Sequence, residues 1–362
     1  NLMRIIRPIT FPLFGLMFFF FLSVVFTGGE YTSINKYLLL SWNLIIIFFY
    51  ILYIQSSNEI IKTSKFISYY SGILATLGII IWISYLFGYE YIVSGREGIG
   101  FIYKNPDVIH GRLRLFDTDP NAYGLYILPM IFNVIGLQAF YSSIGNKSKL
   151  LLVIILLLML NLIFTFSRGA FISVILILFF NFIILMLNAK LFENNFFRMT
   201  LLLVNIGSII ILISLFLPDI INTFDYLMSG YFSRSDFIAS RYLKWVTALK
   251  IISEHLFWGV GAGNLRNYMD YQSHNTWIEL FAENGLVSTI FMFWIFFIIT
   301  FKSYILIHDL LKNKDPRGYI LLGGLNGLIS MIIMMCSISM FFVIYFWFQI
   351  GYVLLMMYFF KH

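Results

Sequence analysis

The chain has 362 residues, of which 60% are hydrophobic and only 11% are charged. A soluble domain carries roughly 25% charged residues, so this composition excludes a soluble globular protein. The net charge of +7 does not indicate a nucleic-acid partner, because Lys and Arg in such a chain are first explained by membrane topology. The single cysteine, Cys336, excludes an intramolecular disulfide and a cysteine-based metal cluster.

Apolar runs of about 20 residues recur along the chain, and this length suits membrane-spanning helices rather than the strands of a barrel. The sequence therefore predicts an all-α, multi-pass transmembrane bundle of about ten spans. The predicted spans are residues 8–27, 37–55, 69–88, 122–141, 150–167, 169–188, 200–217, 286–306, 319–337 and 339–360. The break between the last two depends on a weak turn signal from Cys336 to Ser339. No internal repeat is visible, and we expect a single polytopic domain over residues 1–362.

Lys and Arg in the short connections predict the orientation. With the N-terminus in the cytoplasm, the basic short connections all fall inside, and the opposite short connections hold little beyond Lys36. The inner basic residues include Arg4, Arg7, Lys62, Lys65, Lys147, Lys149, Lys190, Arg198, Lys302, Lys312, Lys314, Arg317 and Lys361. This alternation favours an even number of spans with both ends inside.

Two long connections, residues 89–121 and 218–285, fall on the outer side although both are rich in Arg and Lys. Long loops cross membranes largely regardless of charge, so the predicted topology stands. Their basic residues fit an anionic ligand, although pairing with nearby carboxylates or lipid headgroups explains any one of them equally well. We expect the longer loop, 218–285, to carry short helices and to perform the chemistry.

Arg168 stands between two strongly apolar runs, in a turn too short to form a solvated loop. A cation held at or below the headgroup level is costly and usually has a dedicated partner. We therefore favour a functional role over that of an interfacial arginine whose head reaches water. Gly169 and Ala170 leave room for close approach.

A second basic pair, Arg112 and Arg114, lies near the end of the first long loop. In an extended segment two such side chains share one side and could grip a phosphate. Pairing with Asp117 and Asp119 is at least as good an explanation.

Residues 240–255 predict a helix with an apolar face and a basic edge. The face would consist of Tyr242, Trp245, Leu249 and Ile252, and the edge of Arg241, Lys244 and His255. Such a helix would lie in the outer interface with its basic edge toward a lipid-linked anion, or would be an ordinary interfacial helix. The spacing does not decide between these alternatives.

Gly259, Gly261 and Gly263 follow and superficially match a glycine loop that binds phosphate. No predicted strand precedes them and no Lys-Ser or Lys-Thr pair follows, so a nucleotide site is disfavoured. We expect a flexible turn that lets the chain re-enter toward the site.

His274 is followed by Asn275, Glu279 and Glu283 at helical spacing. A helix that begins near Thr276 would place these three on one face, and Thr276 with Glu279 fits a capping box. His274 would lie at the mouth of that helix, where an imidazole can accept a proton near neutral pH. A capping or packing histidine is the alternative. No second histidine lies at metal-ligand spacing, so no metal site is expected.

Several of these segments together resemble the bacterial O-antigen ligase and O-antigen polymerase superfamily. They are Ser167-Arg168-Gly169-Ala170, Ser240-Arg241 with Trp245, Gly259-Val260-Gly261-Ala262-Gly263-Asn264, and His274-Asn275 with Glu279, Glu283 and Gly285. Asp119-Pro120-Asn121-Ala122 resembles the turn that opens a span in the same family. The resemblance covers roughly residues 100–300, and the order and spacing of the motifs carry it.

The resemblance implies an inverting membrane glycosyltransferase of the GT-C type that needs no metal and no cofactor. Its donor would be a glycan on undecaprenyl diphosphate, presented at the periplasmic side of the inner membrane. Arg168 and Arg241 match family arginines that hold the diphosphate, and His274 matches the histidine taken as the base for the acceptor hydroxyl. Further candidates are Arg112, Arg114 and Arg234 for the diphosphate, and Asn275, Glu279 and Glu283 as supporting residues.

The chemistry is consistent with these residue types. Arginine forks can neutralise the charge on a leaving diphosphate without a metal, while one base removes the hydroxyl proton. A metal-dependent transferase would want an Asp-x-Asp pair, and Asp117-Thr118-Asp119 has that form. Pro120 follows directly, so we interpret this segment as a turn and a helix cap.

Three functions are compatible with these features. A polymerase would join lipid-linked repeat units of O-antigen or a capsular polysaccharide, whereas a ligase would move the finished glycan onto lipid A-core. We favour the polymerase, although no residue decides between the two. A flippase would require ionisable residues and broken helices at mid-membrane. The polar residues gather on one predicted face instead.

Overall fold

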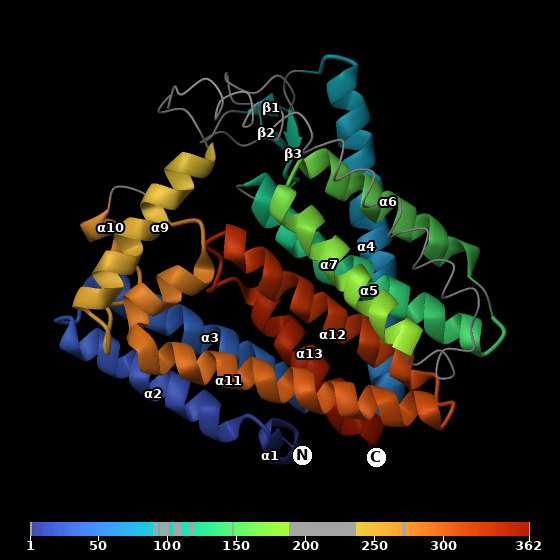
Figure 1. Cartoon of the computed structure of the whole chain (residues 1–362). Coiled ribbons are helices and arrows are strands. Elements are labelled where there is room, and N and C mark those ends of the chain that lie inside the picture. Colours follow the sequence, from blue (N-terminus) through green and yellow to red (C-terminus); the bar gives the residue numbers. More distant parts are fainter. Residues whose placement is uncertain are drawn as a thin grey trace. The chain divides into compact units, whose positions relative to one another are not determined.

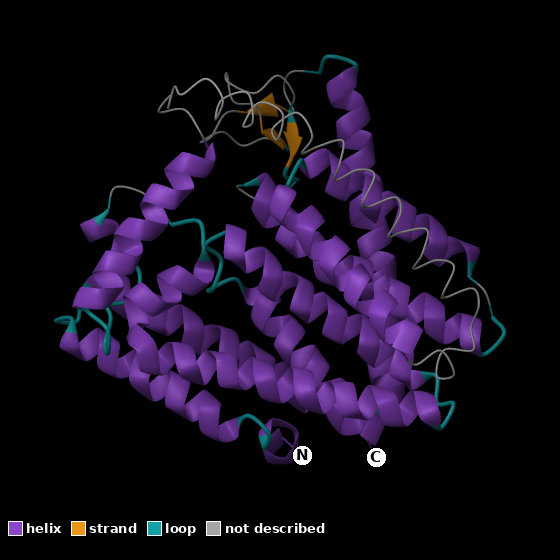
Figure 2. Cartoon of the chain, viewed as in Figure 1, coloured by secondary structure: helices purple, strands orange, loops and turns teal. Residues whose placement is uncertain are grey.

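The computed structural model describes residues 2–89, 93–94, 101–103, 111–115, 119–146, 148–187, 237–269 and 273–361. Within these ranges the chain is helical apart from one small sheet and the connecting turns (Figure 2). It divides into two compact units. Unit 1 comprises residues 1–54, 216–302 and 335–358, and unit 2 comprises residues 55–215, 303–334 and 359–362.

Each predicted span except 200–217 overlaps a described helix, although α4 begins 12 residues and α11 begins 10 residues before the predicted start. Figure 1 labels the helices. They are α1 (Leu2–Ile6), α2 (Thr10–Phe26), α3 (Tyr31–Tyr53), α4 (Ser57–Leu86), α5 (Pro120–Ser143), α6 (Lys149–Thr165), α7 (Arg168–Leu187), α9 (Phe237–Glu254), α10 (Leu265–Tyr268), α11 (Thr276–Lys312), α12 (Arg317–Met334) and α13 (Ile344–Lys361). The predicted helix at 240–255 corresponds to α9.

Six of the described helices are long and apolar enough to cross a membrane: α3, α4, α5, α11, α12 and α13. This confirms an all-α, multi-pass membrane protein. The described residues support fewer spans than the ten predicted, because α2 and α6 have only 17 residues each and the apolar part of α7, Arg168–Asn181, is shorter still. At about 1.5 Å per residue even a helix of 17 residues is roughly 26 Å long, short of a bilayer core of about 30 Å. The predicted span 200–217 lies outside the described residues.

Aromatic contacts join the helices of unit 1. The ring of Phe19 on α2 lies 5.7 Å from that of Phe291 on α11, and Phe20 lies 6.1 Å from Tyr37 on α3. Phe20 is fully buried. α11 is two helical segments, because Gly285 has a φ of 75° and a ψ of 177° and breaks the helix after its first turns.

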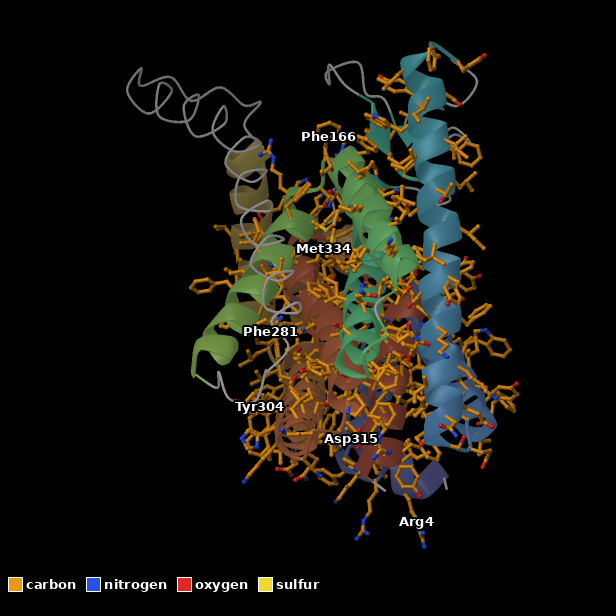
Figure 3. All side chains as sticks on the ribbon, turned by 90° about the vertical axis from the view of Figure 1, so that its right-hand side faces the viewer. Arg4, Phe166, Phe281, Tyr304, Asp315 and Met334 are labelled. Atoms are coloured by element: carbon orange, nitrogen blue, oxygen red, sulfur yellow. The ribbon has the colours of Figure 1, made fainter. Side chains whose placement is uncertain are left out.

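Unit 2 is built around α5, which packs against α4, α6, α7 and α12 (Figure 1). α5 and α12 approach closely at Gly136 and Gly323, where a Cβ on Gly136 would lie 2.7 Å from the carbonyl oxygen of Tyr319. Small residues at such crossings let helix backbones pack tightly in membranes. Met334, at the end of α12, is fully buried (Figure 3).

Local signals set the helix ends as expected. The Asp119 side chain accepts a hydrogen bond from the backbone N–H of Asn121 and caps α5, with Pro120 as its first residue. This confirms the predicted cap. α6 ends at Thr165, and the next residue, Phe166, has a φ of 49° and lies at the turn before α7 (Figure 3). The break expected near Ser337 is also present, since a short 3₁₀ turn and a loop separate α12 from α13.

The first long loop contains a small sheet that the sequence did not predict. β1 (Val93–Ser94) pairs in parallel with β2 (Ile102–Tyr103), which pairs antiparallel with β3 (Arg112–Leu113). Ile102 and Leu113 are partners across β2 and β3, and both are fully buried. Burial of this cross-strand pair gives a short sheet to a segment whose sequence shows no long alternation.

Candidate active site

His274 lies in the turn that leads into α11 and is half-buried. Its φ of 54° is in the left-handed region, which residues other than glycine rarely adopt. Such a conformation costs about 1–2 kcal/mol and persists only where the surroundings fix it. Strained positions of this kind cluster at functional sites.

Hydrogen bonds fix the residues on both sides of His274. Asn275 Oδ1 accepts from the backbone N–H groups of Trp277 at 3.0 Å and Ile278 at 3.2 Å, so Asn275 caps α11. The backbone N–H of Ser273 donates to Glu279 Oε1 at 2.9 Å. The backbone on both sides of His274 is therefore held in place.

The predicted capping box of Thr276 and Glu279 is wrong. The Asn275 amide already occupies the first-turn N–H groups, so Thr276 faces elsewhere. Its hydroxyl donates to the carbonyl of Ile338 and accepts from the backbone N–H of Met340 at 3.0 Å. Thr276 thereby ties the start of α11 to the segment before α13.

α9 is attached to the same turn. Trp245 Nε1 donates to the carbonyl oxygen of Ser273 at 3.0 Å, directly before His274. Arg241 lies four residues before Trp245 on α9, about one helical turn away. Two predicted catalytic positions, Arg241 and His274, therefore belong to elements joined by a hydrogen bond.

The buried row of α9 differs from the predicted face. Ala248, Ile251 and Ile252 are buried against a cluster that includes Val260, whereas Leu249 is 54% exposed. The reason is that α9 packs on the glycine loop and the start of α11, which selects the row at i, i+3 and i+4.

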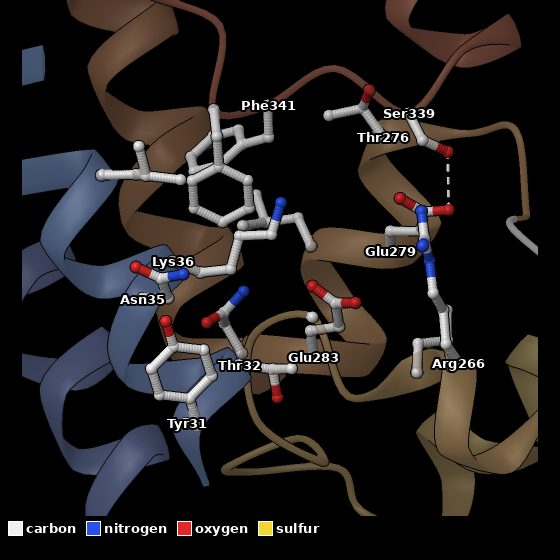
Figure 4. Close-up of a pocket in the computed structure, with 16 residues that line it drawn as sticks. Tyr31, Thr32, Asn35, Lys36, Arg266, Thr276, Glu279, Glu283, Ser339 and Phe341 are labelled. Carbon is white, nitrogen blue, oxygen red and sulfur yellow. Dashed lines mark hydrogen bonds between the residues drawn. The ribbon is translucent and has the colours of Figure 1, made fainter. Parts of the chain in front are cut away.

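A cavity of about 310 Å³ opens beside this turn, within unit 1 (Figure 4). Its walls come from the start of α3, the glycine loop, the start of α11 and the segment before α13. The polar lining residues are Thr32, Asn35, Lys36, Arg266, Thr276, Glu279, Glu283, Asn284 and Ser339. Aromatic rings of Tyr31, Phe341 and Phe342 complete the wall.

The charged side chains of the cavity are held in place. Lys36 Nζ lies 4.7 Å from the ring centroid of Phe342 and faces the same space as the Glu283 carboxylate (Figure 4). Glu283 is only 8% exposed, and the backbone N–H groups of Gly263 and Leu265 donate to its carboxyl group. The cavity thus contains fixed carboxyl groups beside an ammonium donor.

The glycine loop forms a tight crossing with α11. Gly259, Gly261 and Gly263 have φ values of 70°, 90° and 80°. The backbone N–H of Gly261 donates to the carbonyl of Glu283 at 2.8 Å, and a Cβ on Gly259 would lie 2.4 Å from the Glu283 backbone. A turn is present as expected, but these backbone hydrogen bonds hold it against α11, so the prediction that it is flexible is wrong. Its role is to fix the part of α11 that carries Glu283.

In unit 2, Arg112 on β3 binds the end of α6. Its Nε donates to the carbonyl of Thr165 at 2.9 Å, and its Nη2 donates to Asn121 Oδ1 at 3.0 Å and to the carbonyl of Phe166 at 3.4 Å. A cation is favourable at a helix C-terminus, where carbonyls lack partners. Much of this guanidinium therefore serves the structure.

Arg168 lies close enough to Arg112 for its positive charge to affect the pKa of the Arg112 guanidinium. Burial lowers the pKa of Arg112, Asp119 opposes this, and the positive charge of Arg168 lowers the pKa further. Arg114 is buried, with its guanidinium carbon 6.0 Å from the ring centroid of Tyr103. The three arginines therefore belong to one basic region of unit 2.

Arg112→Ala is expected to reduce the free energy of unfolding by about 1.5–3 kcal/mol, because hydrogen bonds from a charged group are lost. Thermal unfolding of the purified protein checks this, with the exposed Arg7→Ala as control. If Arg112→Ala unfolds as the wild type does but loses glycan transfer, Arg112 serves the substrate and the capping role is wrong.

Gly169 and Ala170 have a packing role. Ala170 is fully buried, and its Cβ lies 3.2 Å from where a Cβ on Gly124 of α5 would stand. The small residues after Arg168 thus let α7 approach α5, while Arg168 itself is half-buried at the first position of α7.

The predicted site residues fall into two groups. Arg112, Arg114 and Arg168 are in unit 2, and Arg241, His274, Asn275, Glu279 and Glu283 are in unit 1. Arg234 and Asp117 lie outside the described residues. Sequence reasoning missed the cavity residues Lys36, Arg266, Asn284 and Ser339. The sequence offered a signal for one of these residues, because Lys36 is the basic residue found in the predicted outer short connections.

These features define a multi-pass α-helical membrane protein with a polar site built where helices begin. Residues 152–293 match the family model described as O-antigen ligase. This match confirms the predicted resemblance to the O-antigen ligase and polymerase superfamily over that stretch of the chain. The match supports a function of the ligase or polymerase type. Among curated proteins, none matches the chain.

Proposed function

We propose that the protein is an O-antigen or capsular polysaccharide polymerase. It transfers a glycan from an undecaprenyl-diphosphate-linked donor to a sugar hydroxyl of another lipid-linked repeat unit. The observation that supports this most is the bond from Trp245 to Ser273, because it joins the helix of Arg241 to the turn of His274. All of these residues lie in the stretch that matches the family.

In this reaction the acceptor oxygen attacks the anomeric carbon from the face opposite the diphosphate. The new C–O bond forms as the bond to the diphosphate oxygen breaks, and the configuration inverts. His274 takes the hydroxyl proton, and Arg168 and Arg241 neutralise the charge on the leaving diphosphate. Arg112, Arg114 and Arg234 are proposed to extend the basic surface for the diphosphate.

The proposed topology has about ten spans in the inner membrane, with residues 89–121 and 218–285 as outer loops. The cavity in unit 1 supports the orientation. It is lined by the beginnings of α3 and α11 and the segment before α13. In the alternation set by the basic connections, all three fall on the outer side.

A ligase is the second candidate, because the matched family model carries that description. The two functions differ in the acceptor, which is another lipid-linked repeat or lipid A-core. The lipopolysaccharide gel pattern of a deletion strain distinguishes them. Loss of a polymerase leaves single repeats on the core, whereas loss of a ligase leaves none. The second pattern would replace our proposal with the ligase.

Purified protein is expected to transfer glycan in the presence of EDTA, because arginines and one imidazole supply the charge neutralisation and the base. The assay uses a defined undecaprenyl-diphosphate donor, with and without the chelator. If EDTA stops transfer and Mg²⁺ or Mn²⁺ restores it, the mechanism is wrong. Asp117 and Asp119 would then be the residues to test.

A further inference from the structure

We propose that the cavity between Lys36, Glu283 and Asn284 binds an uncharged sugar residue of the glycan substrate. This inference rests on the proposed function, which supplies a lipid-linked glycan. It assigns the recognition of the sugar to a surface separate from the arginines proposed for the diphosphate.

Asn284 is the first observation that indicates a ligand. Its side chain lines the cavity and the residue is only 2% exposed. Within the described part of the chain, neither its Oδ1 nor its Nδ2 has a hydrogen-bond partner. A buried amide with both groups unpaired is costly to the fold, so its presence at a cavity wall calls for a partner in the bound state. A sugar offers hydroxyls that can both donate to and accept from one amide.

The polar groups of the cavity fit a ligand that carries hydroxyls. Lys36 and Arg266 bring cationic donors, and Glu279 and Glu283 bring two carboxyl groups. Sugar hydroxyls can donate to the carboxyl oxygens and accept from the ammonium of Lys36, whereas a phosphate offers acceptors alone. The mixed set of donors and acceptors therefore fits the hydroxyl groups of a sugar.

The apolar part of the wall also fits a sugar. Tyr31, Phe341 and Phe342 line the space together with the polar groups. Aromatic rings can cover the C–H face of a pyranose while the hydroxyls at its edge reach the polar side chains. The volume of about 310 Å³ is at the lower end of the range for small-molecule sites, roughly 300–1,000 Å³. That size suits a sugar residue better than a lipid chain.

Glu279 connects this cavity to the proposed base. Its Oε1 accepts from Ser339 Oγ at 2.6 Å and from the backbone N–H of Ser273 at 2.9 Å. Ser273 directly precedes His274. The Glu279 side chain thus forms both a wall of the cavity and a support of the histidine turn, so a sugar held there lies against a residue that positions the segment of His274.

The test is saturation-transfer NMR on the full-length protein in detergent. The probe is the repeat-unit oligosaccharide released by mild acid from the strain's own lipid-linked pool. We expect the wild type to saturate the sugar protons, and Asn284→Leu and Lys36→Met to bind about tenfold more weakly, since each loses hydrogen bonds. The matched controls, Asn313→Leu and Lys312→Met at the exposed end of α11, should bind as the wild type does.

Thermal unfolding establishes that the variants are folded. Asn284→Leu should unfold at the wild-type temperature or higher, because it removes an unpaired buried amide. The inference is overturned if the folded Asn284→Leu variant binds like the wild type, or if the wild type gives no saturation transfer at high oligosaccharide concentration. If the oligosaccharide binds in the cavity but the protein transfers no glycan, the proposed function is refuted and the sugar-binding site is retained.

Discussion

Replacement of His274 by alanine is expected to abolish glycan transfer. General acid–base catalysis by a positioned group contributes about 10²–10⁴ in rate, so the residual activity should fall by at least two orders of magnitude. The measurement is initial transfer rate in vitro, together with polymer length in cells. Arg168→Ala and Arg241→Ala should also lose transfer, because the leaving diphosphate then carries uncompensated charge.

The left-handed backbone at His274 requires a second variant. Alanine disfavours a φ of 54°, so a loss of activity in His274→Ala could come from a displaced turn. Asparagine tolerates that conformation but cannot act as a base, so His274→Asn should keep the turn and still be inactive. Activity in His274→Asn would show that only the backbone matters. His308→Ala, near the far end of α11, is the matched histidine control and should transfer normally.

Helix positions could be predicted because the signals are local. Asp119 and Pro120 mark the start of α5 whatever lies around them, and the apolar runs identify most of the other helices. The helix of residues 240–255 was also predicted, but its buried row was not. Which row is buried depends on the partner, here the glycine loop, and Leu249 is exposed for that reason.

The candidate site was only partly predictable for the same reason. His274, Glu279 and Glu283 stand close together in the sequence, so their grouping at the start of one helix could be expected. Lys36 and Asn284 can be recognised as site residues only once the start of α3 is seen to line the same cavity as α11. Nothing in the local sequence of either residue indicates that contact. The β2–β3 pair was missed because two-residue strands leave no periodic signal.

The close contact between Gly285 of α11 and the backbone just before the glycine loop gives the second large effect. Gly285→Ala is expected to prevent formation of the candidate site in unit 1. The added Cβ would lie 2.0 Å from the carbonyl oxygen of Phe257 and 2.8 Å from the backbone nitrogen of Trp258. These are backbone atoms, and the adjacent bond from the N–H of Leu286 to the carbonyl of Leu256, at 2.9 Å, holds them in place. The clash adds to a left-handed penalty of about 1–2 kcal/mol, so the loss should amount to several kcal/mol.

Gly28→Ala separates the cost of the clash from the cost of the left-handed backbone. Gly28 also has a positive φ, 82°, but a Cβ there would meet nothing within 4 Å, so it should lose only about 1 kcal/mol. The comparison uses the amount of protein in the membrane and thermal unfolding after purification. Equal behaviour of the two variants would show that the crossing at Gly285 is not tight. We expect a much larger loss of stability in Gly285→Ala, together with loss of oligosaccharide binding. Glu283 and Asn284 directly precede this glycine, and they line the cavity only while the close contact at Gly285 is kept.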